Sequence, residues 1–164
     1  MLGYFANQEE TDKVFKVHSD GLTWVHSDDI GYIDHDGLIY IKDRSKRMII
    51  RPDGHNVWPS EIENVITLHQ AVEACAVIGI KTKEYENGMI PTAFIVLKDE
   101  YKDDTEKIEQ EIDELSSKML PERDKALDYH FRDSLPLTPI GKIDFKTLEG
   151  QENNAPVKTK HLTK

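Results

Sequence analysis

A glycine–lysine pair near the end of the sequence is the first arrangement that could perform chemistry. The stretch RDSLPLTPIGKIDFKTL, residues 132–148, places Lys142 directly after Gly141 and between two isoleucines. A lysine ammonium can stabilise negative charge that develops between an attacking carboxylate and a phosphoryl group. Gly141 lets the backbone come close to a ligand. A Gly-Lys pair is also compatible with an ordinary surface turn, so the rest of the sequence must decide.

A second candidate is the acidic stretch HSDDIGYIDHDG, which contains six possible metal ligands: His26, Asp28, Asp29, Asp34, His35 and Asp36. In a β-hairpin, neighbouring side chains point to opposite faces, so only part of this set can converge. Asp34 and Asp36 are explained by a tight hairpin turn, and the full ligand pattern of a calcium loop is absent. We therefore predict no metal site. A single carboxylate that accepts hydrogen bonds from a diol is the more modest prediction.

A third candidate is a basic stretch in an otherwise acidic protein, KDRSKRMIIRPDG, with Arg44, Lys46, Arg47 and Arg51. One interpretation is a solvated linker, and the other is a hinge that also handles anions. The planar guanidinium of Arg44 can bridge phosphate and sugar oxygens. It is as well suited to pair with Asp43 or Asp34.

Composition limits the partners of this chain. Its 164 residues include 21 basic and 31 acidic side chains, a net charge of −10, which argues against nucleic acid or an anionic membrane as the main partner. The single cysteine, Cys75, lies in an apolar run and reads as a buried strand residue rather than a nucleophile. The first residues lack the basic start and apolar stretch of a signal peptide, so we expect none there, and no apolar run is long enough to span a membrane. We expect a cytoplasmic protein.

Two parts must position these candidates. For residues 1–43 the sequence predicts a short surface helix followed by β-hairpins, including the turn DHDG. By themselves these elements would leave sheet edges and one apolar face uncovered. From Met48 the predicted order is β-α-β-β-α-β, a split βαβ, ferredoxin-like unit of the α+β class. Its helices are predicted at residues 59–69 and 105–119, and Ser60 with Glu63 resembles a capping box. Residues 151–164 form a polar tail that we expect to be disordered.

The order and spacing of these stretches resemble one known family. MLGYFANQEET, WVHSDDIGYIDHDG, KDRSKRMIIRPDGHNVWPSEIE and LPLTPIGKIDF together are similar to the C-terminal part of the adenylate-forming enzymes. That superfamily includes acyl- and aryl-CoA synthetases, peptide-synthetase adenylation domains and luciferases. The resemblance runs from Met1 to about Gly150, and GHNVWPSEIE and LTPIGKID are most similar to acyl-CoA synthetases.

The resemblance implies a reaction in two halves. A carboxylate attacks the α-phosphate of Mg²⁺-ATP to give an acyl-adenylate and pyrophosphate, and a thiol, usually that of CoA, then displaces AMP. A small C-terminal lid domain swivels between one pose for each half. The implied cofactors are ATP, Mg²⁺ and CoA, and the implied partners are a carboxylic acid and a thiol of CoA or an acyl carrier.

The nucleotide contacts implied by the resemblance fall on the hairpin region. Asp29 matches the aspartate of a Thr-Gly-Asp stretch that holds the ribose hydroxyls, and Ile41 matches a position lining the nucleotide pocket. Arg44 matches an arginine that contacts ribose and phosphate. In this sequence Ser27, Asp28 and Asp29 replace Thr-Gly-Asp, and we expect the extra carboxylate to crowd the ribose and lower nucleotide affinity.

The remaining implied roles belong to the lid. Lys46 matches the hinge position, within a hinge at residues 44–47. Gly54 lies in a loop that lines the pantetheine tunnel, although RPDGHN is one residue longer than the usual form. Lys142 matches the lysine that enters the site only in the adenylating pose. The resemblance thus divides the chain into a remnant of the large domain (residues 1–43), the hinge, a lid domain (48–150) and the tail (151–164).

The phosphate-binding loop, the acid pocket and the glutamate that helps to hold Mg²⁺ have no counterpart in this sequence. The resemblance therefore implies a C-terminal fragment of a CoA ligase that is inactive alone and needs the N-terminal adenylation domain as its partner. One alternative is a stand-alone interaction or regulatory domain that binds CoA, an acyl carrier or a separate large subunit in trans. Another is an α+β domain that retains no activity.

Overall fold

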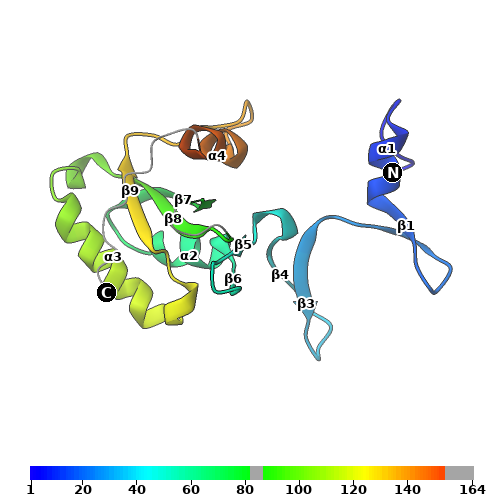
Figure 1. Cartoon of the computed structure of the whole chain (residues 1–164), viewed down its shortest axis with the longest axis horizontal. Coiled ribbons are helices and arrows are strands. Elements are labelled where there is room, and N and C mark those ends of the chain that lie inside the picture. The colour runs from blue at the N-terminus through cyan, green and yellow to red at the C-terminus, as the bar shows by residue number, and fades with distance from the viewer. Residues whose placement is uncertain (82–86, 154–164) are drawn as a thin grey trace. The chain divides into compact units, whose positions relative to one another are not determined.

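The computed structural model describes residues 1–81 and 87–153. They divide into two compact units, Met1–Lys46 and Arg47–Lys164 (Figure 1). The division falls inside the stretch 44–47 that the sequence predicts as a hinge, and the hinge role itself stays a prediction. Each unit is described separately below.

The first unit consists of one helix and two β-hairpins: α1 (Gln8–Val14), β1 (Phe15–Val17), β2 (Thr23–Val25), β3 (Asp29–Ile33) and β4 (Ile39–Arg44). The side chain of Asn7 caps α1 by accepting a hydrogen bond from the Glu10 amide at 3.1 Å. The amides of Asp36 and Leu38 each donate to the Asp34 carboxylate at 2.9 Å. The predicted DHDG turn is confirmed, and these two bonds explain why an aspartate occupies its first position.

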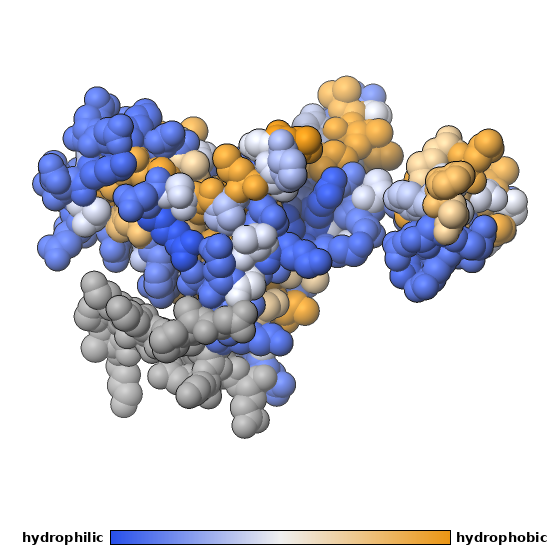
Figure 2. All heavy atoms as spheres, turned by 90° about the horizontal axis from the view of Figure 1, so that it is seen from above, coloured by the Kyte–Doolittle hydropathy of each residue, from blue (hydrophilic) through white to orange (hydrophobic). Residues whose placement is uncertain are grey.

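This first unit lacks an apolar core. Among residues 1–46, all of which the structure describes, Asp43 is the one buried residue. Large apolar side chains lie on the surface instead (Figure 2), among them Leu2, Phe5, Trp24, Ile33, Ile39 and Ile41. An uncovered apolar surface of this kind marks an interaction site in soluble proteins.

The second unit is a small α+β domain, as predicted. Its main elements are β5 (Ile49–Ile50), β6 (Asn56–Val57), α2 (Pro59–Ile66), β7 (Val72–Ile80), β8 (Ile90–Leu97), α3 (Thr105–Met119), β9 (Asp128–Arg132) and α4 (Phe145–Asn153). Three short 3-10 turns complete the described elements of the chain: η1 (Ser45–Arg47), η2 (Asp99–Tyr101) and η3 (Glu122–Asp124). The predicted helix at residues 105–119 is confirmed at both ends.

The sheet topology differs from the ferredoxin-like pattern in one strand. The three-stranded sheet has the order β7-β8-β9, with β7 antiparallel and β9 parallel to β8. The first strand of the predicted series, β5, pairs with β6 in a separate two-stranded sheet. The two residues of β5 turn back into β6 through the loop around Gly54, so β5 reaches its nearest partner along the chain.

Alternate side chains of β7 and β8 pack into two apolar layers, one on each face of the sheet. Val77 and Ile95 belong to one cluster with side chains of α2 and α3. Ile78 and Phe94 belong to a second cluster with Leu148 of α4. Helix α4 therefore covers one face of the sheet, and α2 and α3 cover the other (Figure 1). Cys75 is buried in β7, as predicted, and burial raises the pKa of its thiol.

Two local predictions were wrong. Trp58 is the N-cap of helix α2 and Pro59 is its first residue, so Ser60 is not the N-cap that the predicted capping box requires. Helix α4 was not predicted, and its last residues, 151–153, were assigned to a disordered tail. The signal for α4 was Asp144, whose carboxylate accepts a hydrogen bond from the Thr147 amide at 3.0 Å, as an N-cap does. Residues 154–164 of that predicted tail lie outside the described residues.

Truncation of Ile112 tests the core between α3 and the sheet. Ile112 is fully buried, whereas Met119 at the end of the same helix is 52% exposed. We expect Ile112→Ala to lower the free energy of unfolding by about 2–5 kcal/mol, because it leaves a cavity. Met119→Ala, the matched control, should change it by about 0.5 kcal/mol or less. Urea denaturation followed by circular dichroism measures both, and equal effects of the two variants would contradict this core.

The histidine on β9 makes stability depend on pH. His130 Nε2 lies 3.0 Å from Asp128 Oδ2, and this hydrogen bond raises the pKa of His130 above its ordinary value of 6.5. A raised pKa means that the folded state binds the proton more tightly, so the stabilisation is complete below pH 6.5. It is lost as the pH rises through the folded pKa. We expect urea unfolding at a series of pH values to show this decline in the wild type and a smaller decline in His130→Gln.

Candidate functional site

The loop that carries Lys142 is held by its own backbone. Leu137 and Ile143 form an isolated antiparallel bridge across its base. The Thr138 amide donates to the Lys142 carbonyl at 2.7 Å, and the Gly141 amide donates to the Thr138 carbonyl at 2.9 Å. Gly141 has a φ of +76°, in the left-handed region that glycine adopts without strain. The loop therefore presents Lys142 from a defined backbone position.

The ammonium group of Lys142 is available to a ligand. Within residues 1–81 and 87–153, we find no hydrogen bond or ion pair of its side chain. Its neighbour Ile140 is 78% exposed, so this tip of the loop projects into solvent. A lysine on a fixed backbone with an unpaired head group can neutralise an anion that approaches it.

The three residues predicted to bind nucleotide share the β3–β4 hairpin. Asp29 and Arg44 are direct cross-strand partners, and Asp29 Oδ1 lies 3.4 Å from Arg44 Nε. Arg44 thus pairs with Asp29, and the backbone amide of Arg44 donates a hydrogen bond to the Asp43 carboxylate at 2.7 Å. Ile41 stands opposite Gly31 and is 65% exposed. The hairpin presents a carboxylate, a guanidinium and an apolar side chain, a set that suits a ribose, a phosphate and a base.

Gly31 is a residue of this hairpin that sequence reasoning missed. A Cβ at position 31 would lie 2.2 Å from the Tyr40 carbonyl oxygen, so no other residue fits without a backbone shift. The register also shifts between Ile30 and Gly31, which marks a β-bulge. This bulge sets the pairing of Asp29 with Arg44. The glycine in DIGY, inside a strand pattern, was the available signal.

The extra carboxylate of Asp28 is paired with the predicted hinge lysine. Asp28 Oδ2 lies 2.5 Å from Lys46 Nζ, and this hydrogen bond lowers the pKa of Asp28 below its ordinary value. Asp28 also has a φ of +64°, a conformation that glycine adopts more readily. The backbone at this position therefore fits the glycine of the family's Thr-Gly-Asp stretch. The Lys46 ammonium partly neutralises this carboxylate, and its effect on a ribose stays a prediction.

Gly54 lies in the turn between β5 and β6. It has a φ of +78°, and its amide donates to the Arg51 carbonyl at 2.9 Å. Polar side-chain contacts attach this turn to η3: His55 Nε2 lies 2.5 Å from Asp124 Oδ1, and Arg123 Nη2 lies 3.1 Å from Asp53 Oδ2. The longer RPDGHN loop is therefore anchored on both sides of its glycine.

The six predicted site residues are divided between the two units. Asp29, Ile41, Arg44 and Lys46 belong to the first, and the last of them directly precedes the division. Gly54 and Lys142 belong to the second, on separate loops. The structure brings Asp29 and Arg44 into contact, and it places Lys46 against Asp28.

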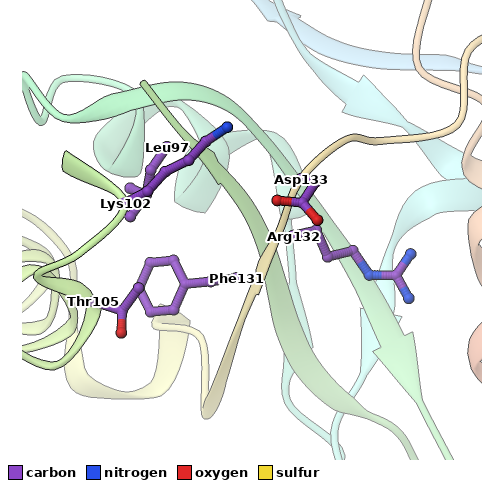
Figure 3. A pocket seen from close by; sticks show the side chains of 6 residues that line it. All are labelled: Leu97, Lys102, Thr105, Phe131, Arg132 and Asp133. Carbon is purple, nitrogen blue, oxygen red and sulfur yellow. The ribbon is translucent and has the colours of Figure 1, made fainter. Parts of the chain in front are cut away.

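A small cavity in the second unit contains none of the predicted site residues. It encloses about 170 Å³ and is lined by Leu97, Lys102, Thr105, Phe131, Arg132 and Asp133. Figure 3 shows the Phe131 ring beside Thr105, and the guanidinium of Arg132 points away from both. Pockets for small-molecule ligands are typically about 300 Å³ or larger, so this cavity is too small for a nucleotide or CoA.

The part of the chain that the structure describes contains no group of three or more His, Cys, Asp or Glu side chains that could hold a metal ion. It also contains no helix with the length and apolar character needed to cross a membrane.

Comparison with known proteins places the chain in a family. Residues 61–142 of its 164 match the model of the AMP-binding enzyme C-terminal domain. The chain is 36% identical over 143 residues to a long-chain-fatty-acid–CoA ligase of Bacillus subtilis, covering 87% of this chain and 23% of that protein. It is 40% identical over 143 residues to 4-coumarate–CoA ligase-like 1 of Arabidopsis thaliana, covering 87% and 24%.

A solved structure shows the same architecture. The o-succinylbenzoate CoA synthetase of Bacillus subtilis, in complex with its acyl-adenylate intermediate, aligns with a TM-score of 0.73 at 27% identity. The alignment covers 94% of this chain and 28% of that one. The chain thus spans about a quarter of the length of the curated relatives it matches. Because the family model covers half of its length, the chain belongs to the AMP-binding enzyme C-terminal domain family, the small domain of the adenylate-forming enzymes.

Proposed function

We propose that the chain is the C-terminal part of an ATP-dependent carboxylic acid–CoA ligase. In that ligase the acid and ATP give an acyl-adenylate and pyrophosphate, and the thiol of CoA then takes the acyl group and releases AMP. The observation that carries this proposal is the Lys142 loop, which combines a fixed backbone with a side chain that has no partner among the described residues. Relatives named as CoA ligases over 87% of this chain support the same reaction class.

Lys142 is assigned to the first half of the reaction. Negative charge gathers between the attacking carboxylate and the α-phosphate as the new bond forms, and a lysine ammonium stabilises that charge. Such a group must reach the reacting atoms without giving up another partner. The unpaired ammonium on a fixed loop satisfies this requirement.

The β3–β4 hairpin is assigned to the nucleotide. The Asp29 carboxylate can accept hydrogen bonds from both ribose hydroxyls, and Arg44 can bind the phosphate. Their own contact of 3.4 Å is long for an ion pair and leaves Arg44 71% exposed, so a ligand can replace it at little cost. Ile41 supplies an apolar side chain beside them.

The Gly54 turn is assigned to contact with CoA, and Mg²⁺ binding is assigned to the adenylation domain. A glycine with positive φ, in a turn held to η3 by side-chain hydrogen bonds, suits a backbone surface along which the pantetheine arm passes. Mg²⁺ is assigned to the adenylation domain, since the described residues include no cluster of ligands for it. The exposed apolar side chains of the first unit are the surface that this domain would cover.

Replacement of Lys142 tests the assignment directly. In the ligase that carries this chain, we expect Lys142→Ala to slow adenylation by about 100- to 1,000-fold, because the developing charge loses its cation. Thioester formation from supplied acyl-adenylate should stay within a few-fold of wild type. Pyrophosphate exchange measures the first step and acyl-CoA release the second. Lys146→Ala, an exposed lysine on α4, is the matched control, and wild-type adenylation in Lys142→Ala would refute the proposal.

Replacement of Asp29 tests the nucleotide hairpin. Asn keeps the size of the side chain but removes the charge, so Asp29→Asn should raise the KM for ATP by roughly 10-fold, the cost of weakened hydrogen bonds to a charged group. The KM for the acid should not change. Asp36→Asn in the turn of the same hairpin is the control, and similar KM values for ATP in both variants would place the ribose elsewhere.

A further inference from the structure

Arg47 is the first residue of the second unit and lies directly after the predicted hinge lysine. Its side chain turns inward and is only 22% exposed. A guanidinium in such a position must be held by partners, because a partly buried charge without them is costly. The identity of those partners shows what Arg47 connects.

The first partner is Glu63 on α2. Arg47 Nη2 lies 2.5 Å from Glu63 Oε1, and the Glu63 side chain is 15% exposed. The same Glu63 oxygen accepts a hydrogen bond from the Val77 amide of β7 at 2.8 Å. Glu63 therefore connects the start of the unit to a helix and to the sheet.

The second partner is Phe145, the first residue of α4. The guanidinium carbon of Arg47 lies 3.9 Å from the centroid of the Phe145 ring, a close cation–π contact. Phe145 follows Lys142 by three residues, and the Asp144 amide between them donates to the Pro136 carbonyl at 2.8 Å. The position of the ring is thereby linked to the backbone of the loop that presents Lys142.

We infer that Arg47 is a positioning residue for Lys142. It clamps the start of α4, through Phe145, to the chain segment that leaves the predicted hinge and to the α2–β7 core. A backbone rotation at Lys46 would then carry the Lys142 loop as one body with the unit. This inference rests on the proposed role of Lys142. It adds Arg47 as the residue that links the Lys142 loop to the chain segment next to the predicted hinge.

Arginine is required for both contacts at once. Its planar guanidinium can present an edge to a carboxylate while its face lies on an aromatic ring, and lysine cannot do both. Arg47→Lys should therefore keep the pair with Glu63 and lose most of the contact with Phe145. Phe145→Leu removes the ring alone, and Phe145→Tyr keeps its face.

Amide hydrogen exchange on the 164-residue chain tests the clamp without any activity. In Arg47→Met we expect the amides of Thr138, Gly141 and Asp144 to exchange about 10-fold faster, as local opening becomes easier. Phe145→Leu should give the same result, Phe145→Tyr should resemble wild type, and the double variant should add little to either single one. Lys125→Met removes a cation that is 8% exposed and pairs with Glu122, away from α4, and serves as the control.

The two half-reactions test the positioning role in the ligase. We expect Arg47→Met and Phe145→Leu to slow adenylation by about 10- to 100-fold, because the loop is misplaced, with a KM for ATP within about twofold of wild type. Thioester formation from supplied acyl-adenylate should change much less, whereas a purely structural role would lower both steps together. If Arg47→Met does not fold, Arg47→Lys and the two Phe145 variants carry the test.

The outcomes separate this inference from the proposed function. Loop amides that exchange at wild-type rates in Arg47→Met and Phe145→Leu would overturn the clamp, whatever the activity. Wild-type adenylation in these variants, alongside a large loss in Lys142→Ala, would overturn the positioning role and keep the proposed function. Wild-type adenylation in Lys142→Ala would refute the proposed function, while the exchange rates would still decide whether Arg47 holds the loop.

Discussion

Strand β8 is buried along its whole length, and this burial requires an apolar layer on each face of the sheet. Because side chains alternate along a strand, Ile95 must be covered from one side and Phe94 from the other. Helices α2 and α3 provide the first layer and α4 provides the second. The loop of Lys142 leads directly into α4, so the packing of the sheet also determines where the predicted catalytic lysine lies.

The two units differ in what stabilises them. The second has a continuous core on both sides of its sheet, whereas the first buries only Asp43 and leaves its apolar side chains exposed. Two short hairpins without a core are marginal in water. Exposed apolar side chains on such a unit are consistent with its proposed place against an adenylation domain. Its polar interactions are local: the Asp34 turn, the Asp29–Arg44 pair and the Asp28–Lys46 pair.

Predicted functional residues lie on loops and strand ends that are fixed by short-range hydrogen bonds. Gly141 and Gly54 adopt positive φ angles in such loops, and Asp28 adopts one beside the β3–β4 hairpin. Side-chain contacts between distant segments then fix these loops to the domain. His55 with Asp124 holds the Gly54 turn, and Arg47 with Glu63 and Phe145 holds the start of α4. Local geometry shapes each loop, and long-range side-chain contacts position it.

The sequence by itself determined the α+β class, helix α3, the apolar strands β7 and β8, the DHDG turn and the family, because periodicity and motif spacing are local properties of a chain. It did not determine that β5 pairs with β6, that Glu63 binds Arg47, or that residues 145–153 form a helix. The last two depend on partners distant in the sequence: Arg47 and Val77 for Glu63, and the second face of the sheet for Leu148 of α4. Only the tertiary structure brings such partners within contact distance, since burial and ion pairing are decided by neighbours in space rather than along the chain.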